Sequence, residues 1–488
     1  MLKSTISNLP KYPFLLCLLV LLGCKEADEE VSVGKPNIVF ILVDDLSKEW
    51  VSHYGAEDIK TPNIDKLAEG GLTFHNFYSM PQCTPTRLSF LTAEYPFSHG
   101  WVNHWDVPRW GGGAHFDEKL NPTMLPKIKE AGYKTAIAGK WQIDDFRVEP
   151  DALTKIGFDA FCMWTGWEGG TPASGERYQN PYIYSNTSAS HTYSDGFGPD
   201  IFTKFIVDFI EESKDDPFFV YYPMVLTHTP FVDTPEEASS DDLGKHKAMV
   251  RYTDKITGQI VRALEKAGVR DNTIIVWTTD NGTTSQVSGS LNGRMVRGGK
   301  GTTQESGINQ PFIVNWPGHI KPGLETDALI DITDLLPTFV DLVNPTTLPE
   351  PSAFGGKSFK NLITGKSDDS ERSWILGMGG KNNARLTNRG VENQYVYRDR
   401  VLRDKRFKLC IGTNGSPEGF YDLKEDPFEE NNLVNKVEGI AQKETYEKLM
   451  AVVGQFPKED NEPKYEPNSV QDWDVAITAE SKKWKKDY

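Results

Sequence analysis

The residues that point most directly to chemistry are Cys83, Pro85 and Arg87, which stand two positions apart in the stretch PQCTPTRLSFLT. Cys83 precedes a helix that we expect to begin near Pro85, and the first backbone N–H groups of a helix form a ready site for an anion. Arg87 lies one helical turn further on and can point back toward Cys83. Together, these features favour attack on a tetrahedral oxyanion. The alternative, common for an isolated cysteine, is a buried structural thiol.

Acidic and amide side chains follow two apolar runs that lie far apart in the sequence. Asp44 and Asp45 follow the first run, and Asp280 and Asn281 follow the second. Runs rich in Ile and Val are typical of buried parallel strands, whose carboxyl ends meet at one edge of a sheet. One site could therefore hold all four side chains. The alternative is that they cap neighbouring helices.

The elements that must position these residues alternate between strands and helices. We expect strands at 37–43, 134–138, 217–222, 272–278 and 311–316. We expect helices at 63–69, 123–131, 201–212, 245–267 and 332–343. This alternation predicts an α/β fold, in which a large mixed, mostly parallel sheet is sandwiched by helices.

The pattern changes after a segment rich in Pro and Gly at 345–356. Short strands at 373–376, 394–398, 407–411 and 419–423 then precede a helix at 440–453. We therefore predict a main domain at 37–350, a smaller C-terminal α+β subdomain built on an antiparallel sheet at 351–470, and a polar tail at 471–488.

Composition excludes several classes of protein. The chain has 488 residues, with 53 Lys and Arg against 69 Asp and Glu, so its formal net charge is −16. This balance argues against a nucleic-acid partner, which usually meets a basic face. Five cysteines in so long a chain argue against a disulfide scaffold. The mean hydropathy of −0.48 excludes a polytopic membrane protein.

The N-terminus has the pattern of an export signal. The apolar run Phe14–Leu22 is far shorter than the about 20 residues that span a bilayer. It ends in Leu21-Leu22-Gly23-Cys24, which resembles a bacterial lipoprotein signal. We therefore expect a signal peptide at 1–23, lipidation of Cys24 and an acidic tether at 24–36. These features predict an outer membrane lipoprotein of a bacterium, on its cell surface or periplasmic face; an ordinary secretory signal is the alternative.

Several stretches together resemble the type I sulfatases of the alkaline phosphatase superfamily, whose signature is C-x-P-[ST]-R. In the order of that family, the matching stretches are NIVFILVDD (37–45), CTPTR (83–87), GKW (139–141), HTP (228–230), TDNG (279–282), RGGKGTTQESG (297–307) and FYDL (420–423). The resemblance covers about residues 37–435. It implies an alkaline-phosphatase-like fold and a sulfuric ester hydrolase.

The resemblance also implies a set of roles. Cys83 would be oxidised to formylglycine by a formylglycine-generating or anaerobic sulfatase-maturating enzyme, and the aldehyde hydrate would be the nucleophile. Lys140, Lys300 and Arg87 would bind the sulfate, and His228 would protonate the leaving oxygen. One divalent cation, Ca²⁺ or possibly Mg²⁺, would complete the site. Its ligands would be Asp44, Asp45, Asp280, Asn281 and the modified Cys83.

The chain departs from the family after the GKW stretch, where the usual histidine is Gln142. Glutamine cannot take up a proton at neutral pH, so either a metal-bound carboxylate such as Asp280 accepts it or the site is differently tuned. We expect Gln142, His99 and His104 to contact substrate. Tryptophans in Gly-rich loops, Trp164 among them, could stack on sugar rings or anchor the loops.

These features predict a sulfatase that acts on a sulfated carbohydrate, such as algal polysaccharide or glycosaminoglycan fragments. The lipoprotein signal favours such a substrate, because anchored enzymes commonly meet polymers. The first alternative is a phosphonate monoester or phosphodiester hydrolase of the same superfamily. The second, motivated by Gln142, is an inactive glycan-binding lipoprotein.

Overall fold

The computed structural model describes residues 35–102, 115–164, 177–343, 354–379, 397–466 and 469, and the backbone of 384–387 and 390–393. Residues Lys35–Tyr488 form one compact unit. The segment predicted to be a signal peptide (1–23), Cys24, His104 and the tail at 471–488 lie outside the described residues. Among the described helices, none has the length and apolar character needed to cross a membrane.

A ten-stranded mixed sheet forms the centre of the fold, with the strand order β12-β2-β11-β8-β1-β7-β3-β4-β5-β6. Its strands are β1 (Asn37–Val43), β2 (Leu72–Tyr78), β3 (Lys134–Lys140), β4 (Ala160–Trp164), β5 (Tyr182–Ser185), β6 (His191–Thr192), β7 (Phe218–Pro223), β8 (Thr273–Thr279), β11 (Asn309–Asn315) and β12 (Leu324–Asp331). The central strands from β8 to β4 pair in parallel, whereas β11, β5 and β6 pair antiparallel. The predicted mixed, mostly parallel sheet is confirmed.

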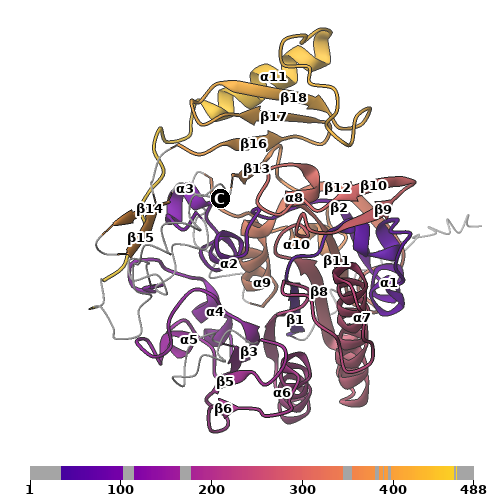
Figure 1. Cartoon of the computed structure of the whole chain (residues 1–488), viewed down its shortest axis with the longest axis vertical. Coiled ribbons are helices and arrows are strands. Elements are labelled where there is room, and N and C mark those ends of the chain that lie inside the picture. Colours follow the sequence, from indigo (N-terminus) through magenta and orange to yellow (C-terminus); the bar gives the residue numbers. More distant parts are fainter. Residues whose placement is uncertain are drawn as a thin grey trace, which may run out of the picture. The chain divides into compact units, whose positions relative to one another are not determined.

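Helices cover both faces of this sheet (Figure 1). They are α1 (Pro62–Glu69), α2 (Cys83–Thr92), α3 (Pro96–His99), α4 (Leu125–Glu130), α5 (Ala152–Lys155), α6 (Gly198–Ser213), α7 (Asp242–Lys266), α8 (Glu305–Ile308), α9 (Leu335–Val343) and α10 (Lys360–Ile363). Alternate residues of β1 separate the two layers: Phe40 packs in the cluster with α2, α4 and α9, and Ile41 in the cluster with α1, α6 and α7. Burial on both faces explains why the β1 run is continuously apolar.

The C-terminal part contains a four-stranded antiparallel sheet of order β13-β16-β17-β18, against which α11 (Ile440–Val453) packs. Its strands are β13 (Ile375–Met378), β16 (Arg400–Arg403), β17 (Phe407–Ile411) and β18 (Pro417–Asp422). Two hairpins complete the chain: β9 (Ser288–Leu291) with β10 (Arg294–Arg297), and β14 (Ala384–Thr387) with β15 (Gly390–Asn393). The strand predicted at 394–398 is wrong for residues 397–398, because pairing with β13 begins only at Arg400.

The parallel register of the central strands decides where their polar ends meet. Val43, the last residue of β1, is the partner of Thr279, the last residue of β8. The residues that follow both strands therefore leave the same edge of the sheet. The carboxyl ends of β7 and β3 adjoin them, because β7 pairs with both β1 and β3.

Candidate active site

Three carboxylates and one amide meet at the ends of β1 and β8. The Asp280 N–H donates to the carbonyl of Val43 at 3.0 Å, and the Asp45 N–H donates to Asp280 Oδ1 at 3.1 Å. The Asn281 amide donates to Asp45 Oδ1 at 2.8 Å. Asp45 has a left-handed backbone (φ 63°), a conformation that Asp tolerates better than most residues. Asp44, Asp45, Asp280 and Asn281 are all buried and lie together as predicted.

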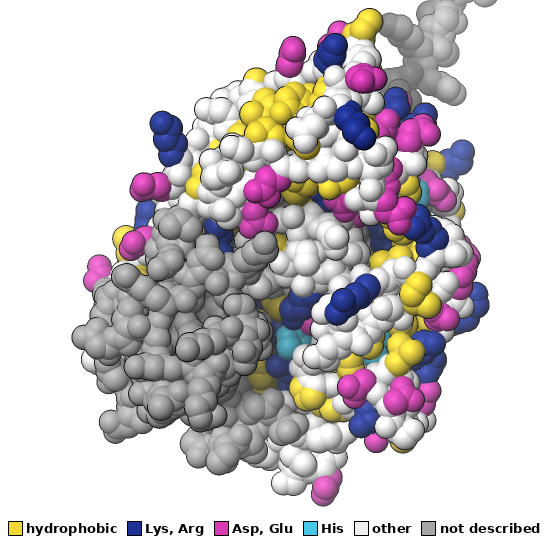
Figure 2. Space-filling model, turned by 45° about the horizontal axis from the view of Figure 1, so that its top comes forward, with side chains coloured by type: hydrophobic (Ala, Val, Ile, Leu, Met, Phe, Trp, Pro, Cys, Tyr) yellow, Lys and Arg dark blue, Asp and Glu magenta, His cyan; other side chains and the backbone are white. Residues whose placement is uncertain are grey.

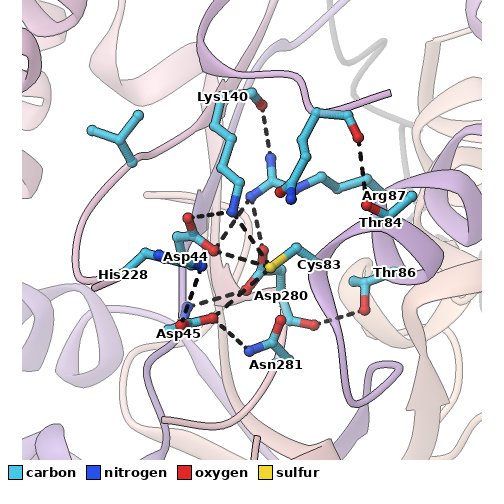
Figure 3. A network of polar contacts seen from close by, with 12 residues as sticks. Asp44, Asp45, Cys83, Thr84, Thr86, Arg87, Lys140, His228, Asp280 and Asn281 are labelled. Carbon is cyan, nitrogen blue, oxygen red and sulfur yellow. Dashed lines mark hydrogen bonds and ion pairs between the residues drawn. The ribbon is translucent and has the colours of Figure 1, made fainter. Parts of the chain in front are cut away.

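Cys83 faces this group from the first residue of α2 (Figure 3). The helix begins at the cysteine itself rather than near Pro85. The Cys83 thiol donates to Asp44 Oδ1 at 3.4 Å, and its sulfur accepts from the ammonium groups of Lys140 at 3.4 Å and Lys300 at 3.8 Å. Burial, and then the charge of Asp280, raise the pKa of the thiol to about 12. The thiol is therefore protonated beside the carboxylates.

Each carboxylate has a cation of its own. The ammonium of Lys140 donates to Asp44 Oδ2 at 2.7 Å, and that of Lys300 donates to both oxygens of Asp45 at 2.7 and 2.6 Å. Arg87 donates to Asp280 Oδ2 at 2.8 Å. Two of these cations, Lys140 and Lys300, also contact the Cys83 sulfur, as an anion-binding site requires.

Steric constraints explain why the residue before Lys140 is a glycine. Gly139 has a φ of +117°, and a Cβ there would lie 2.1 Å from the carbonyl oxygen of Pro223 on β7. Only glycine accepts both the conformation and the close approach of the two strands. Gly139 therefore lets β3 deliver Lys140 to the edge where Asp44 lies.

The pKa values of Asp44 and Asp280 are shifted in opposite directions from the ordinary value. Burial opposes ionisation of Asp44, but the charges of Lys140, Arg87 and Lys300 outweigh it and hold the pKa of Asp44 well below its usual range. Burial, and then the charge of Asp44, raise the pKa of Asp280 to about 7. Two carboxylates that share one buried site separate in this way, because the ionised member disfavours ionisation of the other.

His228 lies at the rim of the same cluster. Its Nε2 is 3.8 Å from Asp45 Oδ2, and its Nδ1 is 2.5 Å from the carbonyl of Thr229. Burial, and then the cations Lys300 and Arg177, lower the pKa of His228 well below its ordinary value. The ring is therefore neutral at pH 7. Its Nδ1–H donates to the carbonyl, and its Nε2 carries the lone pair.

The oxygen atoms among these side chains suit a hard divalent cation. Ligand atoms of Asp44, Asp45, Cys83 and His228 all lie within 4.8 Å of one another. Asn281 Oδ1 is buried and has no hydrogen-bond partner among the described residues. A carbonyl oxygen left unpaired beside carboxylates is the kind of ligand that Ca²⁺ or Mg²⁺ takes. The residues present therefore fit the metal that the sequence predicts.

The residues predicted to contact substrate have different surroundings. Gln142 has a φ of 57°, its carbonyl accepts from Thr84 at 3.4 Å, and its Oε1 is buried without a partner among the described residues. That oxygen can accept a hydrogen bond at the edge of the site. His99 is also buried, but its Nε2 bonds Ser89 and its Nδ1 accepts from the Trp101 N–H. Both of its nitrogens are engaged within the core, so neither is left for a substrate.

Sequence reasoning missed one residue at the site. Arg177 Nη1 lies 3.8 Å from Asp44 Oδ2, and its guanidinium stacks on the ring of Trp164 at 4.3 Å. None of the recognised motifs contains Arg177; the nearest signal was Trp164 in a Gly-rich loop. Four cations thus face three carboxylates. Figure 2 shows basic side chains beside a histidine in a recess of the surface, although the chain as a whole is acidic.

Comparisons with family models agree with this geometry. Residues 36–345 match the family described as Sulfatase. Residues 299–458 match the family described as N-sulphoglucosamine sulphohydrolase, C-terminal.

Individual proteins show the same likeness. An N-acetylgalactosamine-6-O-sulfatase of Bacteroides thetaiotaomicron is 29% identical over 87% of this chain and 95% of its own length. Human arylsulfatase A is 30% identical over 83% of this chain and 84% of its own. The crystal structure of Ps i-CgsB in complex with k-i-k-neocarrahexaose superposes with a TM-score of 0.70 at 23% identity, covering 93% of this chain and 98% of that one.

Proposed function

Because this chain belongs to the sulfatase family and is a sulfuric ester hydrolase, we propose that it releases sulfate from a sulfated carbohydrate at the Cys83 site. One observation carries the proposal. The Cys83 sulfur lies within hydrogen-bonding distance of both Lys140 and Asp44 at the start of a helix. The candidate nucleophile Cys83, the anion-binding cation Lys140 and the candidate metal ligand Asp44 therefore lie in contact with one another.

The nucleophile that we propose is a formylglycine made from Cys83. This group supplies a hydrated aldehyde whose oxygen attacks sulfur while the alcohol leaves, and whose second hydroxyl lets the sulfate depart. Lys140 and Lys300 surround the position of the thiol and would hold the sulfate oxygens as charge develops on them. Arg87, which is fixed on Asp280, orients that carboxylate and adds to the positive field.

Ca²⁺ is the cation that we propose for the oxygens of Asp44, Asp45, Asp280 and Asn281, with Mg²⁺ as the alternative. A bound divalent cation would lower the pKa of the nucleophile and neutralise a sulfate oxygen. The unpaired Asn281 Oδ1 supports this assignment.

His228 is the residue that we propose protonates the leaving oxygen. Its Nδ1 is engaged with the carbonyl of Thr229, so Nε2 is the nitrogen that can serve the substrate, and the side chain is 19% exposed. The neutral ring would take up a proton together with the anionic substrate, whose charge opposes that of the neighbouring cations. His228 would then donate this proton from Nε2 to the alcohol oxygen.

A sugar sulfate is the substrate class favoured by the relative from Bacteroides thetaiotaomicron, whose name specifies N-acetylgalactosamine 6-O-sulfate. Fragments of glycosaminoglycans or algal polysaccharides are the polymers that we propose. We further propose that a lipid on Cys24 anchors the mature chain to the outer membrane. Loss of membrane association and of palmitate labelling in Cys24→Ala would support this anchor, and their persistence would contradict it.

Mass spectrometry of the natively expressed protein tests the proposed nucleophile. We expect the peptide that contains Cys83 to carry formylglycine, while the peptides of Cys162 and Cys410 keep cysteine and serve as internal controls. Sulfate release should then be assayed on p-nitrophenyl sulfate, on N-acetylgalactosamine 6-sulfate and on a phosphodiester. An intact Cys83 in fully active protein, or a preference for the phosphodiester, would overturn the proposal.

A further inference from the structure

We propose that Arg177, held on Trp164, binds a second oxyanion of the substrate, a sulfate or carboxylate on the carbohydrate that carries the reacting ester. This inference rests on the proposed function and names the substrate class more narrowly, as a carbohydrate with two anionic groups. It places the specificity of the enzyme in a residue outside the recognised motifs.

The position of Trp164 fixes the position of the guanidinium. Trp164 ends β4, and its register partner in the parallel sheet is Lys140. The indole therefore leaves the sheet beside the lysine proposed to bind the sulfate. Because the guanidinium lies 4.3 Å from the centre of the indole ring, a cation–π contact holds it over that point.

The backbone that carries Arg177 is tied to the segment that carries His228. The hydroxyl of Tyr178 donates to the carbonyl of Val225 at 2.8 Å and also bonds the carbonyl of His228. The carbonyl of Tyr178 accepts from the Gly198 N–H at 2.7 Å, at the start of α6. Arg177 is thus held in place by buried contacts rather than placed on a free loop.

Arg177 retains hydrogen-bonding capacity that the protein does not use. Its Nε and Nη1 are buried and have no hydrogen-bond partner within the described part of the chain. The 3.8 Å between Nη1 and Asp44 Oδ2 allows an ion pair but is too long for a hydrogen bond. Buried N–H groups are rarely left unpaired, so these atoms indicate a ligand. A guanidinium with donors in a fixed plane suits a sulfate or a carboxylate.

Burial indicates which part of the substrate Arg177 meets. The side chains of Arg87 and Lys140 are 1% and 0% exposed, whereas those of Arg177 and His228 are 12% and 19% exposed. The reacting sulfate belongs beside Cys83, whose sulfur accepts from Lys140 and from the 23% exposed Lys300 but, among the described residues, has no hydrogen bond with Arg177. The sugar must lie toward the surface, on the side of the residue that protonates the leaving oxygen. Arg177 shares that side with His228, so it meets a group of the sugar.

Paired substrates that differ by one anion test this inference. The variant is Arg177→Gln, and the substrates are N-acetylgalactosamine 6-sulfate, N-acetylgalactosamine 4,6-disulfate and a 6-sulfated disaccharide that carries a uronate. We expect kcat/KM for at least one dianionic substrate to fall about 10- to 100-fold more than for the monosulfate, as for a lost charged hydrogen bond. The disulfate and the uronate distinguish the two sources of the second anion.

Two further variants serve as controls. Arg177→Lys keeps the charge but loses the planar donors, and should recover only part of the preference. Arg294→Gln removes an arginine that also stacks on an aromatic ring, Phe428, but is 48% exposed and paired with Glu430. We expect Arg294→Gln to leave the ratio of kcat/KM between substrates as in the wild type.

Equal losses of kcat/KM on all three substrates, or no loss in Arg177→Gln, would overturn the inference. Failure of the proposed function gives a different result, since the wild type would then release sulfate from none of them. In that case calorimetry decides, with Cys83→Ala compared with Cys83→Ala/Arg177→Gln. A rise of about tenfold or more in the Kd of the disulfate or of the uronate-bearing disaccharide, and not of the monosulfate, would support the role of Arg177. Equal Kd values would refute it.

Discussion

Two clusters of buried charges in this chain differ in how completely their polar atoms are paired. The first is the active-site cluster of Asp44, Asp45 and Asp280 with their cations. The second, which we call the junction cluster, comprises Tyr78, Glu305, Arg403, Lys408 and Glu429, and joins the end of β2 and the start of α8 to the four-stranded sheet. Both clusters are buried, and both join segments far apart in the sequence. Comparing the two clusters distinguishes charged residues that stabilise the fold from charged residues whose unpaired atoms can bind a ligand.

In the junction cluster, the buried charged and polar side-chain atoms all have partners among the described residues. Glu305 accepts from Tyr78 at 2.5 Å, from Arg403 at 3.0 Å and from Lys408 at 3.1 Å. Lys408 also pairs with Glu429 at 2.7 Å and donates to the carbonyl of Thr303. Burial opposes ionisation of Glu305, but Lys408 and then Arg403 outweigh it and lower its pKa to about 2. Two cations face two carboxylates, and no buried side-chain atom of these residues lacks a partner within the described ranges.

In the active-site cluster and beside it, several buried polar atoms lack hydrogen-bond partners in the part of the chain that the structure describes. Arg87 Nε, Asn281 Oδ1, Gln142 Oε1 and two nitrogens of Arg177 are buried without hydrogen-bond partners among the residues described. Cations also outnumber carboxylates there. A fold would gain stability from pairing these atoms, so their arrangement supports the anionic substrate and the cation that we propose, which would complete the pairing.

Cys83→Ala should give the largest effect and should separate activity from stability. We expect kcat/KM to fall at least about 10⁴-fold, as when a nucleophile is removed from a group of residues that act together. The free energy of unfolding should change by about 1 kcal/mol or less, since the thiol is small. The control is Cys162→Ala, which removes a buried thiol from β4. Sulfate release by Cys83→Ala near the rate of Cys162→Ala would contradict the assignment.

Lys408→Met should show the opposite pattern. Removing one member of a buried charge network leaves Glu429 and part of Glu305 unpaired, which costs about 3–5 kcal/mol of unfolding free energy. The matched control is Lys405→Met, which breaks surface pairs worth about 1 kcal/mol or less. Denaturant unfolding measures both. If the two variants were equally stable, the junction cluster would not hold the two sheets together as we describe.

Withdrawal of Ca²⁺ should act on the active-site cluster. A ligand that binds only the folded chain adds about 2.7 kcal/mol of stability when its concentration is 100 times its Kd. Unfolding in excess EGTA and in Ca²⁺ should therefore differ by about this amount, and sulfate release should stop in EGTA. Asn281→Ala should shrink the difference, because it removes an unpaired ligand oxygen. Identical unfolding curves in EGTA and Ca²⁺ would exclude Ca²⁺ as the resident metal.

The substitution His99→Gln should give the smallest effect, a change in how stability depends on pH. It tests whether His99 is a buried core residue with both ring nitrogens paired. Burial lowers its pKa from the ordinary 6.5 to about 3. Below pH 6.5 the unfolded chain binds a proton that the folded chain excludes, so stability falls by up to about 1.4 kcal/mol per pH unit toward pH 3. His99→Gln should remove this part of the loss between pH 6.5 and 5.5, measured by urea unfolding. His246, with a pKa also lowered to about 3, keeps its own part. An unchanged pH dependence would show that His99 is not excluded from protonation.

The sequence by itself determined the central strands and the residues that follow them. A continuous apolar run predicts a buried parallel strand, and parallel strands end at one edge, so the pattern alone places Asp44 and Asp280 together. The motif from Cys83 to Arg87 is local, because one helical turn sets its geometry. The short strands of the C-terminal part were placed less well, since antiparallel edge strands depend on their partners more than on their own pattern.

Only the tertiary structure decided which other side chains share the site. His99 follows the Cys83 helix closely in sequence, yet a left-handed Gly100 and the bond to Ser89 turn it into the core. Arg177 lies far from every motif, yet the register of Trp164 with Lys140 brings it to Asp44. Sequence spacing fixes neighbours within one strand or helix. Contacts between elements depend on register and packing across the sheet, which no local pattern records.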